Sequence, residues 1–327
     1  MKVDKSRINS ILLITLSNIG DVVLTIPVLR VLEREFPAAD ITVLAGPNTT
    51  DVFESDPAVS KVIAYNKHMS FSEKLRLVLS MRKKGFDLLV DLRNSLFPLL
   101  IGARYSTPLF KKGDPKIHRR DKHLQKLEAI GISISNAPFS IPFTRDDKLH
   151  VNAMLSELGI LPDDNMIAIA AGAKSHTKRW PSCNFVRLCD RVTKELGVKA
   201  LLVGDESDKA INEEIAGVGS KEVYDLSGRT NIRELAYLFS LCRLLVTNDS
   251  APLHIASAVE LPTIAIFGPT DHIKYGPLST GSIVLKKGLK CSPCEKALCK
   301  FELECMREIT ADHVFSKAKD IYGKQGI

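Results

Sequence analysis

Several signatures that would assign this chain to a common enzyme class are missing. No Gly-x-Gly-x-x-Gly follows its first apolar run, and no Gly-x-x-x-x-Gly-Lys-[Ser/Thr] occurs anywhere. These absences disfavour a nicotinamide dehydrogenase and a P-loop nucleotidase. No Gly-x-Ser-x-Gly is present to support a serine hydrolase. Aromatic residues make up only 6% of the chain and do not interleave with its basic stretch, so we expect no nucleic-acid partner.

Long hydrophobic runs are also lacking. No apolar run reaches the length of a transmembrane helix. The run at residues 11–16 follows basic residues, but it is too short for a signal peptide and leads into a polar turn instead of a cleavage site. With 327 residues and 45% hydrophobic content, the sequence predicts a cytoplasmic α/β protein with two domains.

Charge is in excess on the basic side, with a formal net charge of +7. Residues 111–126 hold seven Lys or Arg against two Asp, and Arg119 and Arg120 lie at their centre. One interpretation is a solvated loop and helix face. The other is a patch for a phosphorylated acceptor or for an anionic membrane surface.

Short apolar runs alternate with amphipathic helical patterns along the whole chain, which predicts mainly parallel, doubly wound sheets. The first helix is expected from Asp21 to about Glu35, with a kink at Pro27. We expect an N-terminal domain at residues 1–160 and a second at 161–310. A final helix at 311–327 is expected to pack back on the N-terminal domain. Two such halves predict a ligand cleft between their carboxyl edges.

The most informative stretch is 246–254, where a strand pattern ends and a helix pattern begins. Ser250 or Asp249 can cap that helix, and Pro252 lies near its first turn. A helix N-terminus at the carboxyl edge of a parallel sheet binds anions, while Asp249 suits sugar or ribose hydroxyls. Plain capping of a buried helix is the alternative. His254 is a candidate contact to a diphosphate or a structural histidine.

Two further loops carry candidate residues. In the first strand–helix turn, Gly20 allows close approach of a ligand, and Asp21 is either a catalytic carboxylate or a favourable charge at a helix start. The loop at 171–181 carries cations before a Pro-initiated helix, a pattern that suits a diphosphate. An exposed basic loop is the alternative. Its candidates are Gly172, Lys174, His176, Lys178 and Arg179, with Trp180 as a packing anchor.

Four of the seven cysteines follow the spacing C-x2-C-x4-C-x5-C at Cys291, Cys294, Cys299 and Cys305. Such a group is compatible with a zinc site, less readily with an iron–sulfur cluster, or with free thiols or an occasional disulfide. Cys183, Cys189 and Cys242 fall in helical patterns and are expected in the core.

Together these motifs resemble glycosyltransferase family 9, the lipopolysaccharide heptosyltransferases. Residues 11–27 are similar to its amino-terminal signature, and 171–181 to its Gly-x-x-x-x-x-Lys-Arg-Trp-Pro loop. Residues 248–254 with 267–270, Phe-Gly-Pro-Thr, resemble its nucleotide-sugar segment. The resemblance implies a GT-B fold of two Rossmann-like domains and an inverting transfer with no catalytic metal or other cofactor.

The resemblance also implies partners. The usual donor is ADP-L-glycero-D-manno-heptose, and the usual acceptor is the lipid-linked inner core of lipopolysaccharide, so the enzyme would lie at the inner face of the cytoplasmic membrane. By position Asp21 matches the general base, Lys178 the lysine that neutralises the diphosphate, and Asp249 the carboxylate on donor hydroxyls. The other donor-binding candidates are Gly172, Lys174, Thr177, Arg179, Ser250, Ala251 and His254. The acceptor-binding candidates are Asn18, Gly20, Arg93, Arg104, Arg119 and Arg120.

One position departs from the family pattern. Ser250-Ala251 stands where the family often has Thr-Gly or Ser-Gly, and Ala restricts the backbone more than Gly. Two alternatives therefore remain beside heptose transfer. One is a related transferase with another nucleotide sugar and glycan acceptor, and the other is a non-catalytic nucleotide-sugar-binding protein.

Overall fold

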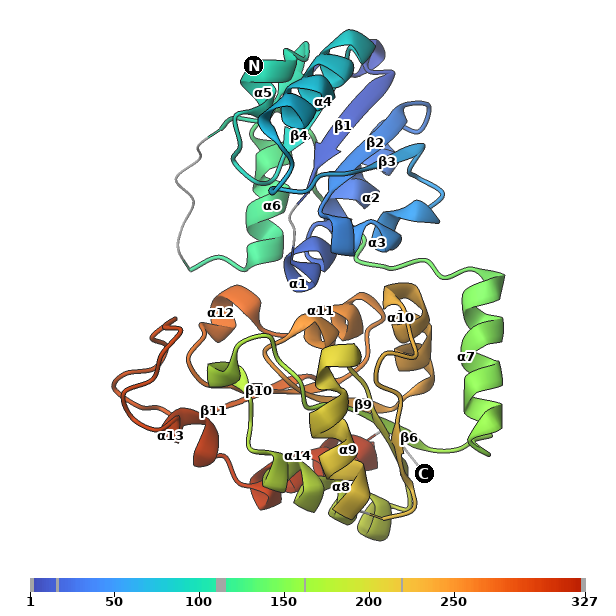
Figure 1. Ribbon diagram of the computed structural model, residues 1–327, viewed down its shortest axis with the longest axis vertical. Helices are drawn as coiled ribbons and strands as arrows, with labels where there is room; N and C mark the ends of the chain where they lie inside the picture. Colours follow the sequence, from blue (N-terminus) through green and yellow to red (C-terminus); the bar gives the residue numbers. More distant parts are fainter. Residues whose placement is uncertain (1–2, 16–17, 110–115, 162, 219, 325–327) are drawn as a thin grey trace. The chain divides into compact units, whose positions relative to one another are not determined.

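The computed structural model describes residues 3–15, 18–109, 116–161, 163–218 and 220–324. The chain divides into two compact units, Met1–Ser140 and Ile141–Ile327. Each unit is a parallel sheet with helices, as the alternation in the sequence predicts (Figure 1). No helix in the described ranges combines the length and apolarity needed to cross a membrane.

The first unit is built on a five-stranded sheet in the order β3-β2-β1-β4-β5. Its strands are β1 (Ser10–Ile14), β2 (Asp40–Ala45), β3 (Lys61–Ala64), β4 (Leu88–Asp91) and β5 (Tyr105–Ser106). Ile11 of the central strand pairs with Ile41 on one side and Leu88 on the other, both in parallel. The apolar residues of β1 are fully buried, because helices cover both faces of a parallel sheet.

The helices of the first unit are α1 (Ile19–Val23), α2 (Ile26–Glu35), α3 (Asp51–Glu54), α4 (Phe71–Lys84), α5 (Phe97–Ile101) and α6 (Arg119–Glu128). The single helix expected from Asp21 is wrong, since the chain breaks between α1 and α2. Pro27 lies in the first turn of α2. Backbone N–H groups in a first turn have no intrahelical acceptor, so the N–H that proline lacks costs no hydrogen bond there. The Thr25 hydroxyl closes the break by donating to the Val22 carbonyl at 2.6 Å.

The second unit holds a six-stranded parallel sheet in the order β11-β10-β9-β6-β7-β8. Its strands are β6 (Met166–Ala170), β7 (Lys199–Leu202), β8 (Val223–Asp225), β9 (Leu244–Asn248), β10 (Thr263–Phe267) and β11 (Ile283–Lys286). Strand order reverses at β6 and β9, which are neighbours although β7 and β8 intervene in the chain. In sheets of this kind, ligands bind at the carboxyl ends of strands beside such a switch point.

The helices of the second unit are α7 (Arg145–Glu157), α8 (Ser182–Leu196), α9 (Lys209–Val218), α10 (Ile232–Leu241), α11 (Ala251–Ala258), α12 (His272–Tyr275), α13 (Glu304–Arg307) and α14 (Ala311–Lys324). Helix α14 belongs to the core of this unit, which differs from the expectation that it packs on the N-terminal domain. Val314 and Phe315 are buried there, and the Arg191 guanidinium of α8 stacks 3.8 Å from the centre of the Phe315 ring.

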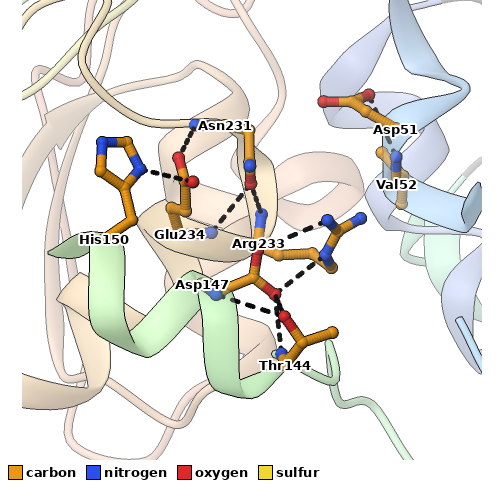
Figure 2. A network of polar contacts seen from close by, with 8 residues as sticks. All are labelled: Asp51, Val52, Thr144, Asp147, His150, Asn231, Arg233 and Glu234. Carbon is orange, nitrogen blue, oxygen red and sulfur yellow. Dashed lines mark hydrogen bonds and ion pairs between the residues drawn. The ribbon is translucent and has the colours of Figure 1, made fainter. Parts of the chain in front are cut away.

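Helix α7 joins the second unit, so the division of the chain precedes the boundary expected at residue 160. A polar network ties α7 to α10 (Figure 2). Arg233 of α10 donates to Asp147 of α7 at 3.1 Å, and His150 lies 2.6 Å from Glu234. The Asp147 side chain is only 5% exposed. This buried ion pair attaches α7 to α10 of the second unit. The composition of the linker gave no sign of this long-range contact.

Candidate functional site

The loops that follow β6 and β9 meet at the carboxyl edge of the second sheet. Asn248, the last residue of β9, joins them. Its side-chain amide donates to the Ala171 carbonyl at 2.7 Å, and its side-chain oxygen accepts from the Trp180 backbone N–H at 3.0 Å. One fully buried side chain therefore holds both ends of the cationic loop. Asn248 was not among the predicted site residues. A polar amide at the end of an apolar strand pattern was nevertheless a sign that this side chain has a specific partner.

Trp180 anchors the same loop, as predicted. The side chain is fully buried, and its indole N–H donates to the Ile309 carbonyl at 2.7 Å. The ring packs edge-on against Phe185 with 4.8 Å between centroids. The loop is thereby attached to α8 and to the segment before α14, which leaves the residues before Trp180 available for binding.

Lys178 and Asp249 form the central ion pair of this edge. The Lys178 ammonium lies 2.7 Å from the Asp249 carboxylate. The Asp249 side chain is only 6% exposed, whereas that of Lys178 is 30% exposed. The pair brings together the two loops that the sequence marked separately. A cation and a carboxylate at one edge fit a ligand that carries both a negative charge and hydroxyl groups.

The remaining predicted donor residues lie around this pair. Thr177 is buried, and its hydroxyl lies 2.8 Å from that of Ser175. Arg179 turns back and donates to the Ala173 carbonyl at 2.8 Å, so part of its donor capacity supports the loop itself. Lys174 and His176 are exposed on the loop. His254 is buried in α11, one turn after the helix begins.

Helix α11 begins at Ala251, with Ser250 as its N-cap and Pro252 in its first turn. Side-chain capping by Ser250 is wrong, since its hydroxyl makes no cap hydrogen bond and lies 3.3 Å from Thr247. Ala251 adopts helical geometry, so the Ala that replaces the family's Gly causes no backbone strain here. The start of α11 thus presents its N-terminal end beside the Lys178–Asp249 pair.

Asp208 is a carboxylate that sequence reasoning missed. It lies over two glycines at the ends of β6 and β7. A Cβ atom on Gly172 would come within 2.1 Å of the Asp208 carboxylate, and one on Gly204 within 2.7 Å. Burial, with a smaller contribution from Asp205, raises the pKa of Asp208 above its usual range. The two glycines leave room for this half-buried acid, and a larger residue at either position would have to displace its side chain.

A cavity of about 330 Å³ adjoins Lys178 within the second unit. Ser175, Thr177 and Lys178 line one side, and Pro269, Thr270 and Tyr275 line another. Residues 295–297 of the cysteine-rich segment complete its lining. The Thr270 hydroxyl is buried without a hydrogen-bond partner in the described part of the chain, so a polar ligand group in this cavity could satisfy it.

The cysteine-rich segment does not form a preassembled metal site. Among the described residues, no three His, Cys, Asp or Glu side chains are placed to hold an ion. Cys291 and Cys299 are exposed, whereas Cys305 is buried. Burial raises the pKa of Cys305, and the other three thiols add to this shift. The Cys299 sulfur accepts hydrogen bonds from two backbone N–H groups, those of Phe301 at 3.3 Å and Leu303 at 3.4 Å, which gives this thiol a role in the local turn.

Of the three other cysteines, Cys189 and Cys242 are buried as predicted, but Cys183 is exposed.

In the first unit, Gly20 and Asp21 lie in α1, which follows the tip of the central strand β1. Asp21 is in the first helical turn, and the Asn18 amide donates to its carboxylate at 3.3 Å. Asp21 is partly exposed. The sequence thus correctly placed this carboxylate at the carboxyl edge of the first sheet.

Arg93 projects from the turn that follows the neighbouring strand β4. Asp91 organises this turn by accepting the Arg93 and Ser95 backbone N–H groups at 2.8 and 2.6 Å. The buried Lys126 ammonium of α6 donates to the Asp91 carbonyl and to the Asn94 side chain. Arg93 then stacks over the Tyr65 ring, 5.4 Å from its centre. Lys126 is a further residue that the sequence did not reveal, because its partner lies 35 positions earlier in the chain.

The other predicted acceptor residues are not all near Arg93. Arg104 precedes β5 and lies 3.8 Å from Asp87, at the amino edge of the sheet, opposite to the edge that carries Asp21 and Arg93. Arg119 and Arg120 begin α6, where Arg120 pairs with Asp121 at 2.7 Å.

His123 and Lys126 of the same basic run are buried. Burial and the nearby Arg119 and Lys126 lower the pKa of His123 to about 3, so its ring is neutral. Residues 111–115 of the run lie outside the described ranges.

Comparison with known proteins identifies the family. The sequence model of glycosyltransferase family 9 (heptosyltransferase) matches residues 138–304, just over half of the chain. This chain belongs to glycosyltransferase family 9. It is therefore a glycosyltransferase, and the matched residues include the loop with Lys178 and the segment with Asp249.

Comparisons with individual proteins support the same family assignment. Lipopolysaccharide heptosyltransferase 3 of Escherichia coli K12 is 28% identical over 284 residues, which cover 79% of this chain and 82% of that protein. The solved family 9 glycosyltransferase of Veillonella parvula DSM 2008 superposes with a TM-score of 0.83 at 23% identity, over 97% of each chain. The ADP-heptose lipopolysaccharide heptosyltransferase II of E. coli gives 0.79 at 23% identity, over 97% of this chain and all of the other. The fold of this family 9 chain is thus GT-B, as the resemblance implied.

Proposed function

We propose that this enzyme transfers heptose from ADP-L-glycero-D-manno-heptose to the lipid-linked inner core of lipopolysaccharide. The observation that carries the proposal is the Lys178–Asp249 ion pair at the carboxyl edge of the second sheet, beside the start of α11. A cation, a helix N-terminus and a buried carboxylate match a diphosphate joined to a hydroxyl-rich sugar. The names of the E. coli relatives support heptose as that sugar.

In the proposed mechanism, Asp21 of the first unit accepts the proton of an acceptor hydroxyl. The acceptor oxygen forms a bond to the anomeric carbon, while the bond from that carbon to the phosphate oxygen breaks on the opposite face. The reaction therefore inverts the anomeric centre. ADP departs with the electron pair, and Lys178 stabilises the charge that develops on its phosphate. These residues carry out the transfer without assistance from a metal ion.

The proposal assigns other residues to binding. Asp249 accepts hydrogen bonds from donor hydroxyls, and the backbone N–H groups at Ser250 and Ala251 contact phosphate. Asp208, which lies over Gly172, provides a second acceptor for hydroxyls of the donor. The Thr270 hydroxyl in the cavity beside Lys178 is an additional contact to the sugar or phosphate. Arg93 binds an anionic group of the acceptor.

Calorimetric titration with ADP, UDP, GDP and CMP tests the donor. We expect ADP to bind more tightly than the other three nucleotides, and Lys178→Gln to weaken ADP binding more than AMP binding, because only ADP carries the β-phosphate. A matched control is Lys209→Gln, since that lysine is half exposed on α9. A preference for UDP or GDP would leave the assignment as a glycosyltransferase unchanged, but it would indicate a donor other than ADP-heptose.

Transfer itself is tested with ADP-heptose and a heptose-deficient inner core as acceptor. The expected product carries one additional heptose with inverted anomeric configuration, as read by mass spectrometry and NMR. Binding of ADP-heptose without turnover on any inner-core acceptor would favour a different glycan acceptor or a protein that only binds the nucleotide sugar.

A further inference from the structure

Helix α4 exposes a row of large apolar side chains. Phe71, Leu75 and Leu79 are 82%, 46% and 54% exposed. They recur every four residues, so they lie on one face of the helix. The opposite face carries Met81, which packs into the core of the first unit with Leu77 and Val78. The core of the first unit therefore uses one face of α4, and the exposed row lies outside that core cluster.

Helix α5 extends the same surface. Leu96, Leu99 and Leu100 are 63%, 68% and 49% exposed. Figure 1 shows α4 and α5 close together at one end of the first unit, and Arg82 of α4 donates to the Leu100 carbonyl at 3.5 Å. Of the twelve large hydrophobic side chains that are exposed in the described ranges, five lie in these two helices and a sixth, Leu96, is the N-cap residue of α5. We call the six residues Phe71, Leu75, Leu79, Leu96, Leu99 and Leu100 the apolar surface. Exposed patches of this kind mark binding sites.

The charges next to the apolar surface have one sign. Helix α4 contains five Lys or Arg and a single acid, Glu73. That acid is occupied by the capping box at the start of the helix, where it accepts from Ser70. Arg76, Arg82 and Lys83 are exposed on the side of the helix that carries the apolar row. Helix α5 has no charged residue.

We propose that the apolar surface docks on an anionic phospholipid bilayer, with Arg76, Arg82 and Lys83 at the headgroups. Helices that bind at membrane interfaces place apolar side chains at the acyl boundary and cations among anionic headgroups. A second copy of this chain would bring the same cations against each other, so the charge pattern favours lipid over self-association.

The chain connects this surface directly to the turn assigned to the acceptor. Leu96 follows Ser95, the last residue of the turn that Asp91 and Lys126 hold around Arg93. Docking through α5 therefore brings Arg93 close to the headgroup plane, where the sugars of a lipid-linked acceptor begin. This part of the inference rests on the proposed function, whereas binding to lipid does not.

The test is co-sedimentation of the whole protein with vesicles. Vesicles of phosphatidylethanolamine and phosphatidylglycerol are compared with vesicles of phosphatidylcholine alone. We expect binding to the anionic vesicles only, weakened by salt. The triple variant Phe71→Ser/Leu75→Ser/Leu79→Ser should lower the bound fraction by roughly tenfold or more. The variant Arg76→Gln/Arg82→Gln/Lys83→Gln should weaken binding by about fivefold per cation removed.

Matched controls come from the second unit. The variant Leu149→Ser/Leu161→Ser/Val218→Ser removes three side chains that are 56%, 65% and 73% exposed. The variant Lys221→Gln/Lys290→Gln/Lys300→Gln removes three exposed cations. Both should bind vesicles like the parent protein. Equal losses in the control and α4 variants, or no binding of the parent protein to anionic vesicles, would overturn the proposal. A parent dimer that the apolar variant converts to a monomer would show that a second copy covers this surface instead.

Activity separates this inference from the proposed function. The apolar variant should transfer heptose to a deacylated, water-soluble acceptor at the parent rate, but lose activity towards the acylated form of that acceptor embedded in anionic vesicles. Vesicle binding by a parent protein that transfers heptose to neither acceptor would leave the docking surface standing and remove the proposed reaction. Equal activity of parent and variant towards the vesicle-borne acceptor would show that docking serves no role in acceptor delivery.

Discussion

The Lys178 ammonium lies 2.7 Å from the Asp249 carboxylate, across 71 positions of sequence. Asp249 is almost completely buried, whereas Lys178 keeps part of its surface in contact with solvent. The carboxylate therefore holds the lysine at the edge of the sheet, where one side of the ammonium group stays available to a ligand. Pairing of this kind fixes the position of the cation before the diphosphate of the proposed donor binds.

Replacement of Lys178 by Gln should lower kcat by roughly 10²–10³-fold, because the proposed mechanism assigns the Lys178 charge to the departing phosphate. Steady-state kinetics with ADP-heptose checks this. Lys209→Gln serves as the control and should keep parent kinetics. An unchanged kcat in Lys178→Gln would remove Lys178 from the mechanism.

Asp21→Asn should abolish transfer and leave ADP binding unchanged, since the proposed mechanism assigns Asp21 to the acceptor hydroxyl and the residue belongs to the first unit. Kinetics and calorimetry on the same preparation measure the two effects. Asp40→Asn is a matched control, because Asp40 starts β2 at the opposite edge of the same sheet. Turnover near the parent rate in Asp21→Asn would mean that another group is the base.

Lys126→Met should raise KM for the acceptor with little change in ADP affinity. The substitution leaves the Asp91 carbonyl and the Asn94 side chain without their donor, so the turn that carries Arg93 loosens. We therefore propose Lys126 as a positioning residue, whereas a purely structural role would lower donor binding and acceptor binding together. Lys122→Met, on the same helix, is the control. The split between the two affinities is read from calorimetry with ADP and kinetics with acceptor.

The Asp147–Arg233 pair should make stability depend on pH. Burial alone would raise the pKa of Asp147, but hydrogen bonds from Arg233 and Thr144 outweigh it and lower the pKa below its usual value of 3.8. Because the folded pKa lies below the unfolded one, the contribution is present above pH 3.8 and is lost as pH falls through the folded pKa. In Arg233→Met the pKa of Asp147 should rise, so stability should begin to fall at a higher pH.

Urea unfolding of both proteins between about pH 3 and pH 7 measures this shift. The control is Arg229→Met, which breaks a more exposed pair with Glu157 on the same helix α7. Exposed pairs contribute about 0–1 kcal/mol, so this control should change little. Parallel pH profiles for Arg233→Met and the parent protein would show that the pair does not set the pKa of Asp147.

Thiol reactivity should divide the cysteines by burial. Burial raises the pKa of Cys189 and of Cys242 to about 12, so neither forms thiolate near pH 8. Titration with a chromogenic disulfide should find Cys183, Cys291 and Cys299 first, because they are exposed. Labelled peptides identified by mass spectrometry check the order. Rapid labelling of Cys189 in the folded protein would contradict the burial described here.

Much of the fold could be predicted, because parallel strands and their helices leave a local pattern. The apolar run at residues 11–16 contains most of strand β1, and the stretch 246–254 contains the end of β9 and the start of α11. The break between α1 and α2 was missed, because the apolar pattern continues across both short helices and therefore predicts a single helix. The α7 boundary was missed because the Asp147–Arg233 contact spans 86 positions.

The sequence by itself determined the family, the α/β class and the placement of Asp21, Lys178 and Asp249 in segments that follow strands, because these depend on short motifs and on local periodicity. Only the tertiary structure decided which of these residues meet. It paired Lys178 with Asp249 and placed Asn248, Asp208 and Lys126 next to the candidate residues. It also placed Arg104 at the opposite edge of the sheet from Asp21. The physical reason is that a hydrogen bond or an ion pair depends on ångström distances between side chains, and chain folding sets those distances between residues that no local pattern connects.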